Sequence, residues 1–231
     1  MNSKLSNVLM FFVTVFIFTG CSVKEIDLEN ILTPEKKEFV YERKAVDENL
    51  LLKVKSITSA MANNQLNLIN KKFIHPEFGF YNLYKLDGHK VFVPQKKIYN
   101  IIEDKTDEIS HLISRVSKKA VVLPIKQENV NFRCSPKNDA YYGWNDEGIY
   151  LNDKTRTYLS SLMDYINSYS KDIKYQEEDL HKAKLIEKTG YKVVLTPEII
   201  YYLNYIDDDW YITMFDRITT DCSTPKKGKK K

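Results

Sequence analysis

The residues of this chain that could carry out chemistry are few and lie far apart in the sequence. Cys21 follows a glycine at the end of an apolar run, and its thiol could become a covalent attachment point. His75 precedes a proline, where an imidazole could act as a general base. Asp216 interrupts an apolar segment and could be a pocket acid. Cys134 and Cys222 are the two remaining thiols.

A structural role competes with catalysis at both His75 and Asp216. The His75 ring can bond a nearby carbonyl and so hold the turn that precedes Pro76. Strand alternation places Asp216 on the same face as Trp210. If that face is the core, the carboxylate needs a partner, such as a backbone turn or a hydroxyl at the end of the sheet. We favour the structural interpretation for both residues, which remain the weak catalytic candidates of this sequence.

The first twenty residues have the pattern of a signal peptide. Lys4 is the one charge, and residues 8–18 are uncharged and mostly apolar. A membrane-spanning helix needs about 20 apolar residues, so this run is too short for a confident anchor. We therefore expect residues 1–20 to be removed, with cleavage between Gly20 and Cys21.

The junction "FTGC" resembles the lipobox of bacterial lipoproteins. Phe18 stands where leucine is usual, whereas Thr19 and Gly20 fit the pattern. The resemblance implies a diacylglyceryl group on the Cys21 thiol, with acylation of the new amino terminus. An uncleaved signal anchor and an ordinary secretory signal are the alternatives. Because Ser22 is not an aspartate, the resemblance favours the outer membrane over the inner membrane, with the domain facing the periplasm or the cell surface.

The charge distribution argues against nucleic-acid binding. The formal net charge of +4 includes five lysines within residues 226–231, so the rest of the chain is close to neutral. A nucleic-acid-binding domain needs a basic face. We expect residues 224–231 to be a basic, disordered tail, with contact to anionic lipid headgroups as the alternative.

Once Cys21 is assigned to lipid, Cys134 and Cys222 form an even pair in an oxidising compartment. Disulfides form and persist there, so we expect a bridge between them. Two free thiols or a metal pair are the alternatives. Neither cysteine has a second Cys or His at metal-ligand spacing, so we expect no metal and no cofactor apart from the lipid.

The remaining sequence predicts one α+β domain over residues 46–223, preceded by a lipidated spacer over residues 21–45. Helical periodicity covers residues 47–61, 66–73, 98–116, 155–169 and 177–188. Strand patterns cover residues 80–84, 91–93, 120–123, 129–134, 141–144, 148–151, 191–195, 198–206 and 210–220. We expect N-terminal helices packed on a curved, mainly antiparallel sheet with a long C-terminal hairpin, in which Asp207–Asp209 makes the turn.

Two segments carry a second resemblance. "NKKFIHPEFGFY" and "DDDWYITMFDRITTDCS" are similar to segments of a group of small bacterial lipoproteins of unknown function. The terminal hairpin is also similar to the nuclear transport factor 2-like (cystatin-like) fold. The preferred function is a non-enzymatic envelope lipoprotein that binds a partner protein or a glycan. An aromatic shelf could serve this binding, formed by Tyr141, Tyr142, Trp144, Tyr150, Tyr201, Tyr202 and Tyr205. The alternative is a small-molecule pocket protein or hydrolase-like enzyme that uses His75 and Asp216.

Overall fold

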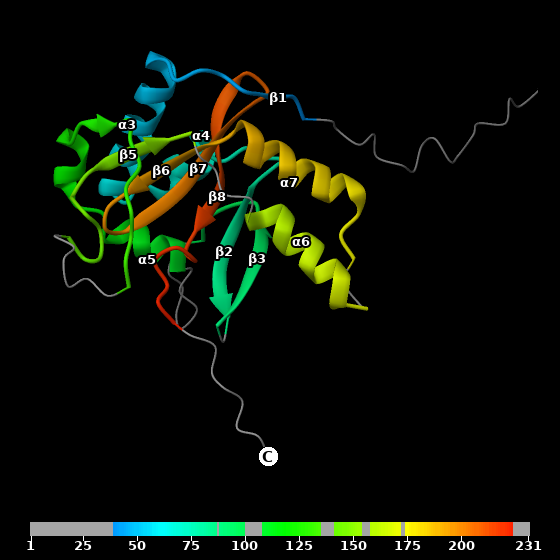
Figure 1. Cartoon of the computed structure of the whole chain (residues 1–231). Coiled ribbons are helices and arrows are strands. Elements are labelled where there is room, and N and C mark those ends of the chain that lie inside the picture. The colour runs from blue at the N-terminus through cyan, green and yellow to red at the C-terminus, as the bar shows by residue number, and fades with distance from the viewer. Residues whose placement is uncertain are drawn as a thin grey trace, which may run out of the picture. The chain divides into compact units, whose positions relative to one another are not determined.

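The computed structural model describes residues 39–86, 88–99, 108–134, 141–153, 158–171 and 174–223 (Figure 1). The signal peptide, Cys21, most of the expected spacer and the lysine tail lie outside these residues. The compact unit begins at Phe39, earlier than the expected boundary at residue 46. The reason is that the first strand, β1 (Tyr41–Glu42), pairs with the central sheet.

The described residues form an eight-stranded mixed sheet that is open. Its order is β3-β2-β8-β7-β6-β5-β4, and β1 joins it by pairing with β7. Two neighbouring pairs, β2 with β8 and β4 with β5, are parallel, and the other pairs are antiparallel. The remaining bounds are β2 (Phe80–Leu86), β3 (His89–Gln95), β4 (Ile125–Lys126), β5 (Ile149–Asn152), β6 (Tyr191–Leu195), β7 (Ile199–Ile206) and β8 (Asp209–Asp216).

Helices lie against both faces of this sheet. They are α3 (Glu48–Ala62), α4 (Leu66–Lys72), α5 (Glu108–Ser114), α6 (Tyr158–Tyr169) and α7 (Glu177–Thr189), with one 3₁₀ helix, η1 (Lys118–Val122). Two cores result: α3, α4 and α5 contribute to one, and α6 and α7 contribute to the other. Alternation along β7 divides its side chains between them, since Tyr201 belongs to the first core and Tyr202 to the second. The expected α+β class is confirmed.

Two local predictions hold in detail. Asp47 caps α3, and its Oδ1 accepts a hydrogen bond from the Leu50 amide at 2.8 Å. The turn between β7 and β8 consists of Asp207 and Asp208, at φ values of 47° and 68°, whereas Asp209, which was also expected in the turn, already begins β8. Aspartate tolerates this left-handed region better than most residues, which suits a tight hairpin turn.

The strand predicted at residues 120–123 is wrong, because residues 120–122 belong to the 3₁₀ helix η1 and Leu123 is its C-cap. Ser117 caps this helix by accepting a hydrogen bond from the Lys119 amide. Ala120 is buried and Leu123 packs against the core, but Val121 and Val122 are 40% and 83% exposed, so the run does not lie in the sheet as a strand. Strand preference depends on burial against neighbouring strands, and here that burial is missing.

The segment around Tyr141 also differs from its predicted strand. Tyr141 and Trp144 bond each other's backbone across a short local turn, so they make an isolated bridge. Phe132 adds one further bridge to Trp144, which replaces the strand expected at residues 129–134. The last strand also ends earlier than expected, at Asp216.

Candidate functional site

His75 holds a turn through its ring. Its Nδ1 accepts hydrogen bonds from the backbone amides of Glu77 and Phe78, at 3.2 and 3.1 Å. Its Nε2 lies 3.4 Å from a carboxylate oxygen of Asp207, in the turn between β7 and β8. The ring is 5% exposed and packs edge-on against Phe39. Both nitrogens therefore have structural contacts.

Asp216 ends β8 by capping the backbone that follows. Its Oδ1 accepts hydrogen bonds from the Ile218 and Thr219 amides, both at 2.9 Å, and its Oδ2 accepts one from the Thr219 hydroxyl at 2.6 Å. The carboxylate is buried, and three donors satisfy it. This is the partner that the burial of a carboxylate requires.

His75 and Asp216 do not share a site. His75 contacts the turn at the start of β8, whereas Asp216 is the last residue of that strand. At about 3.3 Å per residue, the length of β8 separates these two positions by roughly 20 Å. Neither side chain lines any of the four hollows described for this part of the chain.

Cys134 and Cys222 are joined by a disulfide in the structure. The bond links two segments that are 88 residues apart in the sequence. Cys222 lies six residues beyond the end of β8, so the bridge fastens the segment after the strand rather than the strand itself.

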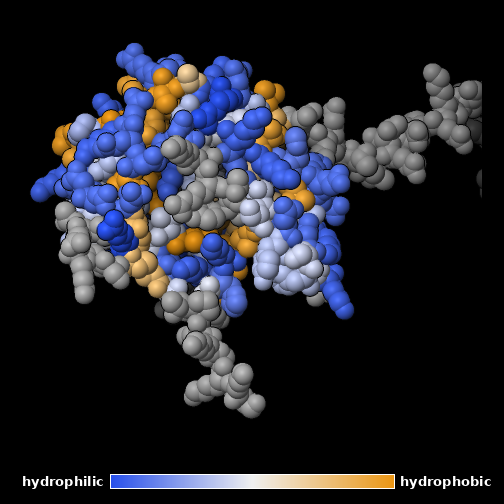
Figure 2. Space-filling model, viewed as in Figure 1, coloured by the Kyte–Doolittle hydropathy of each residue, from blue (hydrophilic) through white to orange (hydrophobic). Residues whose placement is uncertain are grey.

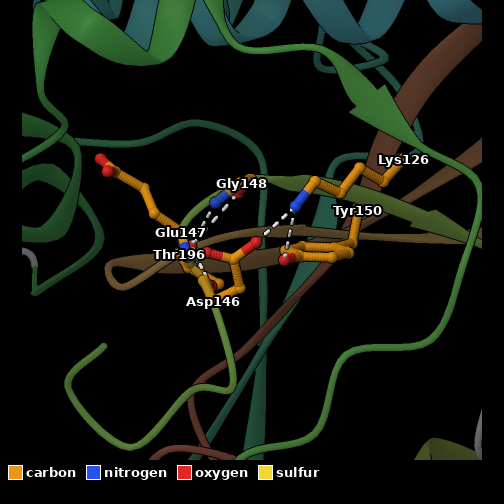
Figure 3. Close-up of polar contacts among 6 residues, drawn as sticks. All are labelled: Lys126, Asp146, Glu147, Gly148, Tyr150 and Thr196. Atoms are coloured by element: carbon orange, nitrogen blue, oxygen red, sulfur yellow. Dashed lines mark hydrogen bonds and ion pairs between the residues drawn. The ribbon is translucent and has the colours of Figure 1, made fainter. Parts of the chain in front are cut away.

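A dense polar cluster lies at the β4 edge of the sheet (Figure 3). The Lys126 ammonium donates to Asp146 Oδ2 at 2.6 Å and to the Tyr150 hydroxyl at 3.3 Å. Behind it, the Gly148 amide donates to the Thr196 hydroxyl oxygen at 2.8 Å. These contacts connect β4, the loop before β5, and the end of β6.

This cluster holds a loop and is poorly suited to catalysis. The hydrogen bond to Asp146, followed by that to Tyr150, raises the pKa of Lys126, so its amine remains protonated and cannot act as a base. The same ammonium lowers the pKa of Asp146. The Thr196 hydroxyl is held among backbone groups of the loop: it accepts from the Gly148 amide and lies 3.3 Å from the carbonyl oxygens of Asp146 and Gly148.

The most apolar of the four hollows is a groove between α6 and the start of β3, with a volume of about 610 Å³. Tyr165 and Tyr169 stand over it, each 62% exposed, with ring centroids 4.8 Å apart. Figure 2 shows the surface over α6 as pale, against the mostly blue surface around it. We call this hollow the α6–β3 groove, and its lining residues are Gly88, His89, Lys90, Val91, Ser161, Leu162, Tyr165, Ile166 and Tyr169.

Polar contacts at both ends fix the helix that forms one wall of this groove. At its start, Glu187 of α7 accepts hydrogen bonds from the Leu159 and Ser160 amides, at 2.6 and 3.1 Å. Towards its end, Asn167 bonds the backbone of Tyr175 through both its amide nitrogen and its oxygen. Tyr165 and Tyr169 are therefore presented from a fixed element.

A second hollow, of about 650 Å³, lies between α3 and the β7–β8 hairpin. It is more polar, and ion pairs occupy part of its charged lining: Lys53 contacts both carboxylate oxygens of Asp209, at 2.6 and 2.7 Å.

The aromatic shelf expected from the sequence is largely absent from the surface, because Trp144, Tyr201 and Tyr202 are core residues. Only Tyr142 of that expected set is widely exposed.

The α6–β3 groove was not predicted from the sequence. Its signal was nevertheless present: Leu162, Tyr165, Ile166 and Tyr169 follow the spacing of one helix stripe. The periodicity identified the helix, but it could not show that part of this stripe would project beyond the core.

A comparison of the chain with protein-family models, curated proteins and solved structures found no match. Within the described ranges, no helix has both the length and the apolar content needed to cross a membrane. Among these same residues, no group of three or more His, Cys, Asp or Glu side chains is placed to hold a metal ion.

Proposed function

We propose that this protein is a bacterial envelope lipoprotein whose domain binds a partner protein in the α6–β3 groove. The single observation that supports the binding role is the exposure of Tyr165 and Tyr169 on a fixed helix above an apolar groove. Tyrosine is enriched where interfaces concentrate their binding energy, because it offers a large area at low entropic cost.

The membrane attachment in this proposal comes from the amino-terminal sequence. Lipid on the Cys21 thiol would anchor the chain, and outer-membrane sorting follows from Ser22 at the next position. The described domain is compatible with a tether on its amino-terminal side. Its first residues enter through β1, and Phe39 packs against Phe78 with ring centroids 5.6 Å apart.

A binding role fits the polar chemistry of the domain better than an enzymatic one. The two catalytic candidates are occupied at opposite ends of β8: His75 contacts Asp207 in the turn before the strand, and Asp216 accepts a hydrogen bond from the Ile218 amide after it. Lys126 is held as an ammonium by its neighbours. A pocket protein or hydrolase that uses both candidates would need them in one cavity, and neither side chain lines any of the four described hollows.

The anchor is tested by metabolic labelling of growing cells with a radioactive fatty acid. We expect label on the wild-type chain and none on Cys21→Ser, which should also leave the membrane fraction. A Cys222→Ser variant is the matched control, because it removes a thiol without touching the lipobox. An unlabelled wild-type chain would contradict the lipoprotein assignment.

The groove is tested by placing a photo-reactive phenylalanine analogue at position 165 of the full chain in living cells. We expect one discrete protein adduct, which mass spectrometry identifies, and no such adduct from position 142, which is 78% exposed but lies outside the groove. The purified partner should then bind Tyr165→Ala at least tenfold more weakly than the wild type, and bind Tyr142→Ala normally. Equal binding by all three proteins would refute the role of the groove.

A further inference from the structure

The floor of the α6–β3 groove includes the edge of the sheet. β3 is the last strand in the sheet order, beyond β2. Figure 1 shows α6 beside this strand, so the groove has a helix on one side and a strand on the other. A strand at a sheet edge presents backbone groups to whatever lies beside it.

Hydrogen bonds elsewhere in the sheet show which backbone groups of β3 point outward. The Arg217 amide donates to the Leu83 carbonyl at 2.9 Å, so the backbone groups of Leu83 point toward β8. Leu83 lies opposite Phe92 in the antiparallel pairing of β2 with β3. Because these pairs alternate between bonded and non-bonded, Leu83 and Phe92 form a non-bonded pair. The N–H and C=O of Phe92 therefore point away from β2, toward the edge of the sheet, where the described part of the chain places no further strand.

Proline at position 94 agrees with this direction. Two residues beyond Phe92, Pro94 also orients its backbone outward, where its missing N–H breaks no ladder bond. Pro94 limits how far another strand could pair along this edge. The usable edge is consequently the first part of β3, which is also the part that lines the groove.

The wall opposite this edge is a continuous stripe of α6. Leu162, Tyr165, Ile166 and Tyr169 all line the groove, and their spacing of three, four and seven residues places them on one helix face. In a strand paired with β3, the side chains would alternate, so that every second one faces this stripe and the others face away from it. The groove thus offers backbone pairing on one side and apolar side-chain contact on the other.

The charges of the lining indicate the sign of the occupant. Among the described residues, the nine that line the groove include His89 and Lys90 but no carboxylate. An occupant with an acidic group near the start of β3 would complement this charge. A second copy of the chain seated edge to edge would instead bring two sets of these basic side chains together, which is unfavourable.

We infer that the occupant of the α6–β3 groove is an extended polypeptide segment, with alternating apolar residues and an acidic group, that pairs with β3 as an added strand. This mode of recognition derives affinity from main-chain hydrogen bonds and specificity from alternate side chains. The inference rests on the proposed function, since it describes the partner of the same groove.

The test uses a phage-displayed library of random dodecapeptides, selected against the full-length chain in detergent and counter-selected against a variant carrying Tyr165→Ala and Tyr169→Ala. We expect the enriched peptides to share alternating apolar positions and an Asp or Glu at a fixed place. Lys90→Glu should weaken the best peptide about tenfold, whereas Lys97→Glu, in the loop after β3, should change its affinity less than threefold.

Strand pairing itself is tested by two measurements on the wild-type chain, which do not depend on a variant folding. N-methylation along the peptide should abolish binding at every second position only, because alternate amides face β3. Amide exchange of Phe92 should slow at least tenfold when the peptide binds, whereas exchange at Val91 and Val93, whose amides face β2, should change little.

The inference would be overturned if N-methylation weakened binding without alternating from one peptide position to the next, or if amide exchange at Phe92 did not change. It would also be overturned if the library yielded no peptide whose binding depends on Tyr165 and Tyr169. A dimer of the chain that protects Phe92, or a carbohydrate adduct from position 165, would overturn it as well. The proposed function is judged separately: a protein adduct from position 165 together with any of the first three results would leave it standing and refute only strand pairing.

Discussion

Glu187 is the residue whose removal should most directly disturb the wall of the groove. It lies in α7 and is 5% exposed, and its carboxylate caps the start of α6, 27 residues earlier in the chain. Its Oε1 accepts hydrogen bonds from the Leu159 and Ser160 amides, and its Oε2 accepts one from the Ser160 hydroxyl at 2.6 Å. The first amides of a helix have no partner within that helix, so the carboxylate satisfies them.

The magnitude follows from the donors that Glu187→Ala would leave without this acceptor. Two buried amides lose their partner at about 1–3 kcal/mol each, and water entering the vacated space offsets part of this. We expect a loss of about 3 kcal/mol in the free energy of unfolding, or roughly 6–12 °C in Tm for a domain of this size. Glu187→Gln keeps an amide oxygen for Leu159 and Ser160, so it should cost about 1 kcal/mol.

The assay is urea unfolding followed by circular dichroism with the disulfide intact. Glu177→Ala is the matched control, because it removes an exposed glutamate from the first turn of the same helix and should cost less than about 1 kcal/mol. If Glu187→Ala is within about 0.5 kcal/mol of the wild type, or no less stable than Glu177→Ala, the capping argument is refuted. A destabilised Glu187→Ala that still folds should also bind more weakly at the groove, since α6 would be less firmly held.

Three further outcomes are expected. Replacing both Cys134 and Cys222 with serine should lower the free energy of unfolding by roughly 4.5 kcal/mol, because the bridge closes a loop with a sequence separation of 88 residues; an unchanged urea midpoint would contradict this. Burial raises the pKa of Tyr81 to about 12, so the wild type should lose stability between pH 10 and about 12, as the unfolded chain ionises first. Tyr81→Phe should lose roughly 2 kcal/mol less over that interval, and parallel pH profiles of the two proteins would refute the assignment. Asp216→Ala should cost about 2–4 kcal/mol in thermal or urea unfolding, and Asp216→Asn clearly less because its amide oxygen keeps an acceptor; equal losses would show that the turn contacts do not set the cost.

Much of the fold could be read from local patterns. Asp47 caps α3 as its position before a helical run predicts, and the β7–β8 hairpin forms around the aspartates that tolerate positive φ. The strand predictions failed where an apolar run has no neighbouring strand to pair with along its length. Residues 118–122 wind into η1, and Tyr141, Trp144 and Phe132 make only isolated bridges within the described residues. Strand preference is a preference for a half-buried surface, and sequence patterns do not show whether such a surface is supplied.

The candidate site was harder to predict than the fold. His75 and Asp216 drew attention because their residue types are chemically versatile, yet both satisfy nearby backbone amides. The tyrosines that the sequence suggested as a shelf are mostly core, whereas Tyr165 and Tyr169 stand exposed. Whether one stripe of a helix is exposed depends on where the helix crosses its neighbours. The periodicity of the sequence does not contain that information.

The sequence by itself determined the features that depend on near neighbours along the chain: the helix starts, the tight hairpin turn and the α+β class. These follow from backbone sterics, capping and hydrophobic spacing, which act over a few residues. Tertiary structure decided the parallel pairing of β2 with β8, the capping of α6 by Glu187, and the meeting of α6 with the edge of β3. Each of these joins segments far apart in sequence, and which segments meet is set by how the whole core packs.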